Sequence, residues 1–129
     1  MDKNPIGWFE IYVDDVERAK HFYQSVFQVT FEQMMDPTGT NIEMWFFPSD
    51  MESYGASGAS GALVKMDGIS AGAGGTLVYF SCEDCTAEQE RATQHGGVVV
   101  QAKMAIGEYG FISLVQDSEG NMIGLHSMQ

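Results

Sequence analysis

Apolar and polar residues follow the same order twice along this chain, and the first copy begins near the N-terminus. Ile6–Val13 is predicted to form a strand, and two acidic residues follow it. Apolar residues then recur at helical spacing to about Phe27, which predicts an amphipathic helix with Asp15 as its N-cap. Further strands are predicted at Val29–Met34, Ile42–Phe47 and Gly61–Met66, with a Gly- and Ser-rich loop before the last of them.

The second copy follows a glycine-rich segment, Gly68–Gly75. This segment lacks the Lys-Ser/Thr pair of a phosphate-binding loop and precedes a strand instead of opening a helix, so we interpret it as a flexible linker. The elements predicted after it are a strand at Leu77–Cys82, a helix between Glu83-Asp84 and Gly96-Gly97, and strands at Val98–Ala102, Tyr109–Val115 and Met122–His126.

The two copies align through their first strand, helix and second strand. Val13-Asp14-Asp15 matches Cys82-Glu83-Asp84 at an offset of 69 residues, and the same offset also superimposes the second strands. The predicted fold is therefore α+β, with two tandem β-α-β-β-β modules that form an open curved barrel around a central cavity. We expect a single domain over residues 1–129, with module one at about 5–67 and module two at about 75–128.

Charge narrows the range of partners. Six basic residues stand against 18 acidic ones, which gives a net charge of −12. Such a surface repels nucleic-acid phosphates and anionic membranes, so neither is expected as a partner. No apolar run is long enough to cross a membrane, and the N-terminal residues do not resemble a secretory signal. A cytoplasmic location is therefore expected.

The two cysteines form a C-x-x-C pair, Cys82 and Cys85. Such a pair can indicate redox chemistry or half of a zinc site. Here no second pair exists, and Cys82 ends a strand. We therefore interpret both as structural thiols, with Cys85 near the start of a helix.

Two motifs resemble the vicinal oxygen chelate superfamily, which includes glyoxalase I, extradiol dioxygenases and bleomycin-resistance proteins. The first is the helix Glu17-Arg18-Ala19-Lys20-His21-Phe22-Tyr23, and the second is the turn Asp117-Ser118-Glu119-Gly120-Asn121. The resemblance covers nearly the whole chain. It implies the duplicated fold, a pocket for a small molecule and a homodimer, but it does not specify a reaction.

The resemblance also implies where relatives bind a divalent metal. Those positions hold Trp8, Leu77 and Gly124 here, with a fourth near Gly61 or Ala62. None of these side chains can donate a lone pair to a metal ion. No metal or other cofactor is therefore expected, except for a divalent metal at an atypical site.

Strand alternation predicts a second layer of residues that face the cavity. Glu10, Tyr79 and His126 each follow a vacated ligand position by two residues, so they should point to the same side as that position. Glu10 is a candidate general base and His126 a candidate proton donor or acceptor. The alternative is structural, since buried polar groups can simply satisfy one another.

Aromatic and aliphatic residues are expected to line the pocket and contact a ligand: Trp8, Tyr12, Trp45, Leu77 and Tyr79. Trp45 either lines the pocket or belongs to the core. The nine methionines are consistent with a soft, apolar or aromatic ligand.

Two functions remain as hypotheses. The first is a metal-independent small-molecule-binding protein of the glyoxalase/bleomycin-resistance type, for which the negative charge would assist a cationic ligand. The second is a glyoxalase-like lyase, isomerase or dioxygenase that uses Glu10 and His126 for acid–base chemistry, or an atypical metal site.

Overall fold

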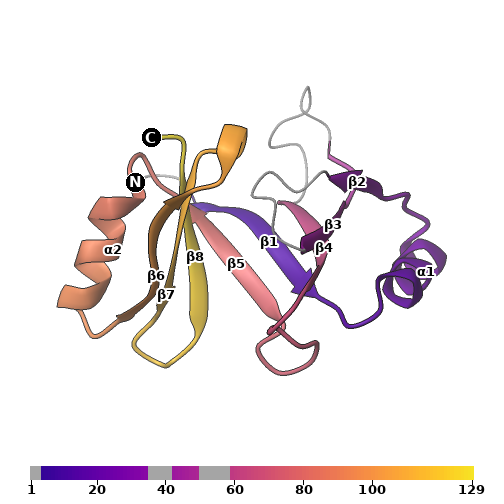
Figure 1. Ribbon diagram of the computed structural model, residues 1–129, viewed down its shortest axis with the longest axis horizontal. Helices are drawn as coiled ribbons and strands as arrows, with labels where there is room; N and C mark the ends of the chain where they lie inside the picture. Colours follow the sequence, from indigo (N-terminus) through magenta and orange to yellow (C-terminus); the bar gives the residue numbers. More distant parts are fainter. Residues whose placement is uncertain (1–3, 35–41, 50–58) are drawn as a thin grey trace. The chain divides into compact units, whose positions relative to one another are not determined.

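The computed structural model describes residues 4–34, 42–49 and 59–129. The chain forms two compact units (Figure 1). One consists of Phe9–Thr76, and the other combines Leu77–Gln129 with Trp8 and the residues before it. The strand β1 (Ile6–Tyr12) therefore begins in one unit and ends in the other.

The unit Phe9–Thr76 contains one helix and three strands besides its part of β1. They are α1 (Val16–Phe27), β2 (Glu32–Met34), β3 (Ile42–Phe46) and β4 (Ser60–Met66). The strands follow the order β2-β3-β4-β1, in which β2, β3 and β4 are antiparallel neighbours. This is the predicted β-α-β-β-β sequence of elements.

The ends of α1 follow from local chemistry. The Asp15 carboxylate accepts a hydrogen bond from the backbone N–H of Arg18 at 3.0 Å, which satisfies a free donor of the first turn. Gln28 adopts a left-handed conformation (φ 55°) and ends the helix. The predicted cap and the predicted end near Phe27 are both confirmed.

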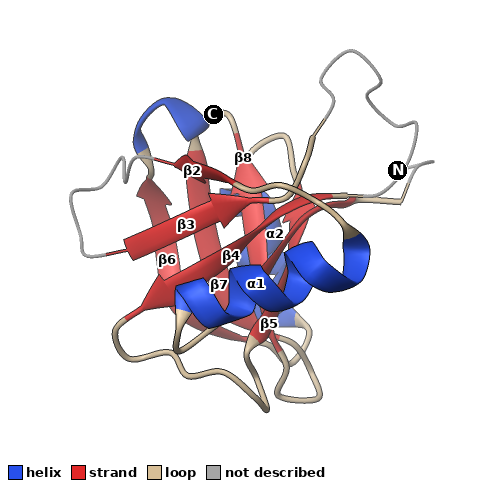
Figure 2. Ribbon diagram, turned by 90° about the vertical axis from the view of Figure 1, so that its right-hand side faces the viewer, coloured by secondary structure: helices blue, strands red, loops and turns tan. Residues whose placement is uncertain are grey.

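The core of this unit lies between α1 and its strands. Its buried members are Val13, Val16, Phe31 and Leu63. Ile11 and Tyr23 pack against them, so β1 and α1 both contribute to this layer. Figure 2 shows α1 lying across β4, with the outer side of the helix toward the viewer.

The other unit contains the second copy of the pattern. Its elements are β5 (Thr76–Ser81), α2 (Cys85–Gln94), β6 (Val98–Ala105), the short 3-10 helix η1 (Gly107–Tyr109), β7 (Phe111–Gln116) and β8 (Met122–Ser127). The strand order is β1-β5-β8-β7-β6, with β5 and β8 parallel and the later pairs antiparallel. The backbone N–H of Ser81 donates to the carbonyl of Pro5 at 2.8 Å, beside the start of β1.

The start and end of α2 match the prediction. Asp84 caps it by accepting from the N–H of Thr86 at 3.0 Å, and Gly96 adopts a positive φ of 94° just after the helix. Cys85, Val115 and Leu125 form the buried core beneath α2, with Phe80 and Cys82 packed against them.

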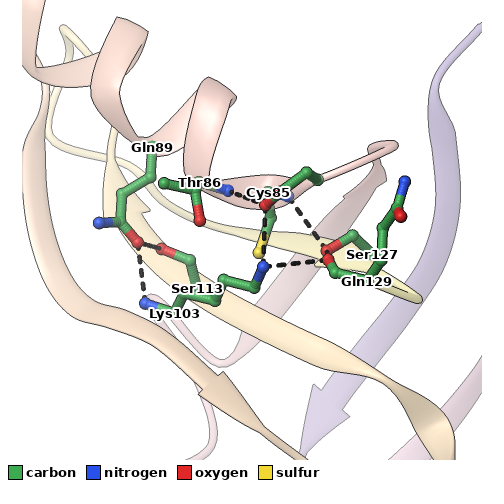
Figure 3. A network of polar contacts seen from close by, with 8 residues as sticks. Cys85, Thr86, Gln89, Lys103, Ser113, Ser127 and Gln129 are labelled. Carbon is green, nitrogen blue, oxygen red and sulfur yellow. Dashed lines mark hydrogen bonds and ion pairs between the residues drawn. The ribbon is translucent and has the colours of Figure 1, made fainter.

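Polar side chains connect α2 to its strands (Figure 3). The Gln89 side-chain oxygen accepts from the Ser113 hydroxyl and from the Lys103 backbone N–H, both at 2.8 Å. The Cys85 N–H donates to the Ser127 hydroxyl at 3.0 Å. Within the described residues, no buried side-chain nitrogen or oxygen lacks a hydrogen-bond partner. The network therefore carries no unpaired group that would indicate a ligand.

One pair of backbone hydrogen bonds shows how closely the two copies correspond. Val13 N–H donates to the carbonyl of Val64 at 2.9 Å, and Cys82 N–H donates to that of His126 at 2.7 Å. Since Val13 and Cys82 are equivalent in the alignment, Val64 is equivalent to His126. Two residues earlier, Ala62 is then the counterpart of Gly124, which decides between the two residues proposed from the sequence.

The fold class is confirmed as α+β with two β-α-β-β-β copies, and the strand order is open because it runs from β2 to β6 without returning. Three strand boundaries differ from the prediction by two residues or more. β6 ends at Ala105 and not at Ala102. β2 begins at Glu32 and not at Val29, because Val29 and Phe31 pack into the core instead of pairing. β7 begins at Phe111 and not at Tyr109, because Gly107–Tyr109 forms a helical turn. Among the described residues, no helix is long and apolar enough to span a membrane.

Candidate functional site

The sheet faces opposite the helices contain most of the residues that the sequence singled out. Ile11 of β1 and Val13, the residue after it ends, pack into the α1 core, so Glu10 and Tyr12 point to the other side. Both are buried, and the Tyr12 hydroxyl donates a hydrogen bond to Glu10 Oε1 at 2.7 Å. The predicted alternation of β1 is confirmed, and it places a carboxylate and a phenol together.

Apolar residues surround this pair on the same face of its unit. Ala62 and Val64 of β4 are almost completely buried. Phe46 lies opposite Ala62 across the β3–β4 pair, and Met44 lies opposite Val64. Directly paired residues in an antiparallel sheet share a face, so Phe46 and Met44 extend the apolar surface beside Ala62 and Val64. The face combines one buried acid with aromatic, methionine and aliphatic side chains.

Trp45 lies on the opposite face. It pairs with Leu63 and packs into the core beneath α1. The Lys20 ammonium sits 3.3 Å from the centre of the indole ring, and the indole N–H donates to Glu43 Oε1 at 3.2 Å. Of the two alternatives for Trp45, this packing supports the core.

In the other unit, Tyr79 and Leu77 are buried on the face of β5 away from α2. Tyr79 lies opposite Gly124 in the parallel β5–β8 pair. A Cβ atom at position 124 would overlap the ring carbons of Tyr79. The Tyr79 ring can therefore lie against β8 only because residue 124 is a glycine.

His126 lies two residues further along β8, and its ring contacts the turn that precedes β7. Its Nε2 atom is 2.6 Å from the backbone carbonyl oxygen of Tyr109. Because a carbonyl only accepts hydrogen bonds, Nε2 carries the proton, and Nδ1 holds the lone pair of the neutral ring. Glu10 and His126 belong to different units.

These residues do not fit the divalent metal centre that the resemblance implies. The resemblance assigns the four ligand positions to Trp8, Leu77, Gly124 and its counterpart Ala62, and none of these side chains offers a donor atom. The Tyr79 ring fills the space beside Gly124. Across residues 4–34, 42–49 and 59–129, no group of three or more His, Cys, Asp or Glu residues is placed to hold a metal ion.

The cysteines are also unsuited to bind a metal or to react. Both are free thiols, and Cys85 is completely buried. Burial raises the pKa of the Cys82 thiol to about 11, and the nearby carboxylate of Glu88 contributes in the same direction. A thiol with this pKa stays protonated at neutral pH, whereas the thiolate is the reactive form. These observations support the structural interpretation of the pair.

The sequence did not indicate two features of the site. The Tyr109 carbonyl that orients His126 is a backbone atom in a helical turn, and the glycines around it were the only signal. The contributions of Met44 and Phe46 depend on the register of β3 against β4, which follows from pairing and not from local sequence.

Comparisons with known proteins show which family the sequence matches and which solved structures have a similar fold. Residues 5–125 match the profile of the Glyoxalase/Bleomycin resistance protein/Dioxygenase superfamily. None of the curated proteins matches the sequence significantly. The fold is similar to the crystal structure of methylmalonyl-CoA epimerase from Mycobacterium tuberculosis, with a TM-score of 0.66 and 15% identity over 97% of this chain and 88% of that one.

Two other solved structures have the same fold. One is a hypothetical protein from Bacillus halodurans C-125, with a TM-score of 0.69 and 8% identity over 96% of this chain and 94% of that one. The second is a variant of the Streptomyces coelicolor methylmalonyl-CoA epimerase in complex with 2-nitronate-propionyl-CoA, with a TM-score of 0.63 and 14% identity over 96% of both chains. At these identities the similarity concerns the fold alone.

Proposed function

Since the chain belongs to the Glyoxalase/Bleomycin resistance protein/Dioxygenase superfamily, we propose that it is a metal-independent member that binds a small apolar or aromatic molecule. The observation that carries this proposal is the Tyr79–Gly124 contact. An aromatic ring takes the space next to a position where relatives commonly place an acidic metal ligand, and the other ligand positions hold Trp8, Leu77 and Ala62.

The chemistry of the Glu10 face indicates which ligands to test first. Phe46, Met44 and Val64 make this face apolar, and Glu10 adds one carboxylate, which accepts a hydrogen bond from Tyr12. The net charge of −12 also attracts cations. An aromatic compound with a single positive group therefore suits this face better than a phosphorylated or carboxylated one.

A second candidate function is acid–base catalysis, as in a lyase, isomerase or dioxygenase-like reaction. The observation in its favour is the tautomer of His126, whose Nδ1 is left to accept a proton because Nε2 donates to Tyr109. Several structural neighbours are epimerases. In this alternative, Glu10 would be the general base and His126 its proton-exchanging counterpart.

The test begins with metal content. The protein is purified from metal-replete medium and its divalent ions are quantified, after which thermal shift is measured with aromatic cations and with their neutral analogues. We expect no stoichiometric metal and a rise in Tm with at least one aromatic cation. A stoichiometric divalent ion in the purified protein, or activity that requires one, would overturn metal independence.

Matched variants separate binding from catalysis. Glu10→Gln keeps the shape of the side chain but removes its charge, and Glu119→Gln is the control because Glu119 lies in an exposed turn. Binding should weaken in the first variant and not in the second. If His126→Ala abolishes a measured turnover while ligand binding persists, catalysis is the better description.

A further inference from the structure

The side of α1 away from its strands, which Figure 2 shows toward the viewer, leaves two large apolar side chains in solvent. Phe22 is 56% exposed and Val26 is 54% exposed. They are four residues apart, so they are neighbours on one side of the helix. Val16 and Tyr23 pack into the core from another side of α1. Phe22 and Val26 therefore form an apolar surface, here called the outer strip, that the fold itself does not bury.

A groove begins at Phe22 and extends toward the N-terminal end of the helix. Its volume is about 320 Å³, and its apolar lining includes Val13, Phe22, Tyr23 and Ala71. The Phe22 and Tyr23 rings meet edge to face with their centroids 5.1 Å apart, which supports Phe22 as one wall of the groove. A small molecule would occupy the groove alone, whereas an extended partner would also cover Val26.

Two carboxylates border the groove near the start of α1. The Asp14 carboxylate accepts a hydrogen bond from the Ala71 N–H at 3.2 Å, and Asp15 caps the helix. Within the described part of the chain, neither carboxylate forms an ion pair, although Arg18 also lines the groove. Residues 22–31 carry no charge. The surface therefore has an acidic end at the groove and an uncharged end at the outer strip.

We propose that the groove and the outer strip together bind a basic amphipathic helix of another protein. One apolar side chain of that helix fills the groove, and another packs against Val26. A Lys or Arg side chain near the end of the bound helix then lies beside Asp14 and Asp15. Four residues of an α-helix span about 6 Å, so apolar residues at positions i and i+4 of the partner match the spacing of Phe22 and Val26.

Charge favours this partner over two others that an apolar helix surface could bind. The unit Phe9–Thr76 contains ten acidic and three basic residues, and the whole chain has a net charge of −12. An anionic membrane is repelled by this charge, and a second copy of the chain would bring the same acidic groups to the contact. A basic helix is attracted instead, and its charge also selects against neutral and acidic helices.

Fluorescence anisotropy with a labelled synthetic peptide tests the proposal. The peptide has about 18 residues, with leucine along one side of the helix and lysine or arginine on the other. A matched peptide has glutamate at each basic position. We expect the intact chain to bind the basic peptide and to bind the acidic one at least roughly tenfold more weakly. Equal affinity for the two peptides, or no binding of the basic one, would overturn the proposal.

Matched variants of the chain locate the binding surface. Phe22→Ser should raise the dissociation constant of the basic peptide roughly tenfold, whereas Val98→Ser should change it little. Val98 is also 56% exposed, but it lies on β6. Asp14→Asn keeps an acceptor for the Ala71 N–H and removes one charge, so it should weaken binding more than Glu119→Gln, which removes a charge from an exposed turn.

Circular dichroism checks that each variant is folded. If Phe22→Ser does not fold, Val26→Ser tests the same strip, since Val26 is more than half exposed. Equal effects within each matched pair would mean that the peptide responds only to the overall charge, and the proposal fails. It also fails if Phe22→Ser dissociates a dimer of the chain, or if the chain sediments with phosphatidylglycerol vesicles and loses this binding in Phe22→Ser.

Discussion

Tyr79 and Gly124 depend on each other, because the aromatic ring covers the position that a Cβ atom at 124 would occupy. Gly124→Ala should therefore destabilise the protein by about 1–3 kcal/mol, the usual range for an overfilled core. Urea unfolding measures the change. The double variant Gly124→Ala/Tyr79→Ser relieves the overlap, so its loss should be smaller than the sum of the two single losses. Simple additivity would show that the contact does not constrain this position.

Single residues were predictable where their role depends on the nearest neighbours in the chain. Asp15 is a cap because it precedes a helix, and Glu10 shares a face with Tyr12 because they are two residues apart in a strand. Trp45 was not predictable, since its side of the sheet depends on pairing with Leu63, which is distant in sequence. The residue that orients His126 contributes only a backbone carbonyl, for which side-chain chemistry gives no signal.

At the scale of elements, α1 depends on its N-terminal cap. Asp15→Ala removes the acceptor for the Arg18 N–H and should destabilise the protein by about 1 kcal/mol, whereas Asp15→Asn should have little effect because asparagine also caps helices. Thermal unfolding of both variants provides the comparison. An equal loss in the two would assign the effect to the charge of Asp15 and not to its hydrogen bond.

An ion pair at the start of α2 makes the stability of the protein depend on pH. The Lys103 ammonium lies 2.9 Å from Asp84 and, together with the Thr86 N–H, lowers the pKa of Asp84 from 3.8 to about 2. Because the folded-state pKa is the lower one, this stabilisation is fully present above pH 3.8 and is lost as the pH falls through about 2. Acid unfolding of the wild type and of Asp84→Asn should therefore converge at the lowest pH.

Lys103→Gln provides the matched control, since it removes the main cause of the low pKa but leaves the cap intact. Adding Lys103→Gln to Asp84→Asn should change the acid dependence little. Two fully additive effects would mean that Lys103 and Asp84 act separately.

The sequence predicted which elements exist better than it predicted where each begins. Both helices have polar caps and glycine or left-handed ends, which are local signals. β2 and β7 begin later than predicted, because apolar residues such as Phe31 are equally suited to a strand and to an unpaired core segment. Only the packed structure shows whether such a residue belongs to a strand or to an unpaired segment of the core.

For the whole molecule, the net charge of −12 has a measurable consequence for the proposed ligand binding. An aromatic cation should bind more weakly as the ionic strength increases, because salt screens the long-range attraction. A neutral analogue of the same shape should be much less sensitive to salt. Titration of both compounds at low and high salt makes the comparison, and equal salt dependence would remove charge from the explanation of affinity.

The duplicated fold was predictable because the first strand, helix and second strand recur at an offset of 69 residues. The site was predictable only in part. The family motifs assign Gly124 to a ligand position, which stays a prediction, and the structure places the Tyr79 ring beside Gly124. The dependence of that ring on Gly124 involves two strands that are distant in sequence, which no local pattern records.

The course of β1 has a consequence for how the protein can be divided. Its first residues complete the second copy, where the Pro5 carbonyl accepts the Ser81 N–H, and its last residues belong with the first copy, where Val13 donates to Val64. A chain cut in the linker at Gly68–Gly75 would leave the C-terminal fragment without its first strand neighbour. The sequence repeat therefore does not coincide with the compact units of the structure. Expressing one repeat alone would separate β1 from some of its hydrogen-bond partners.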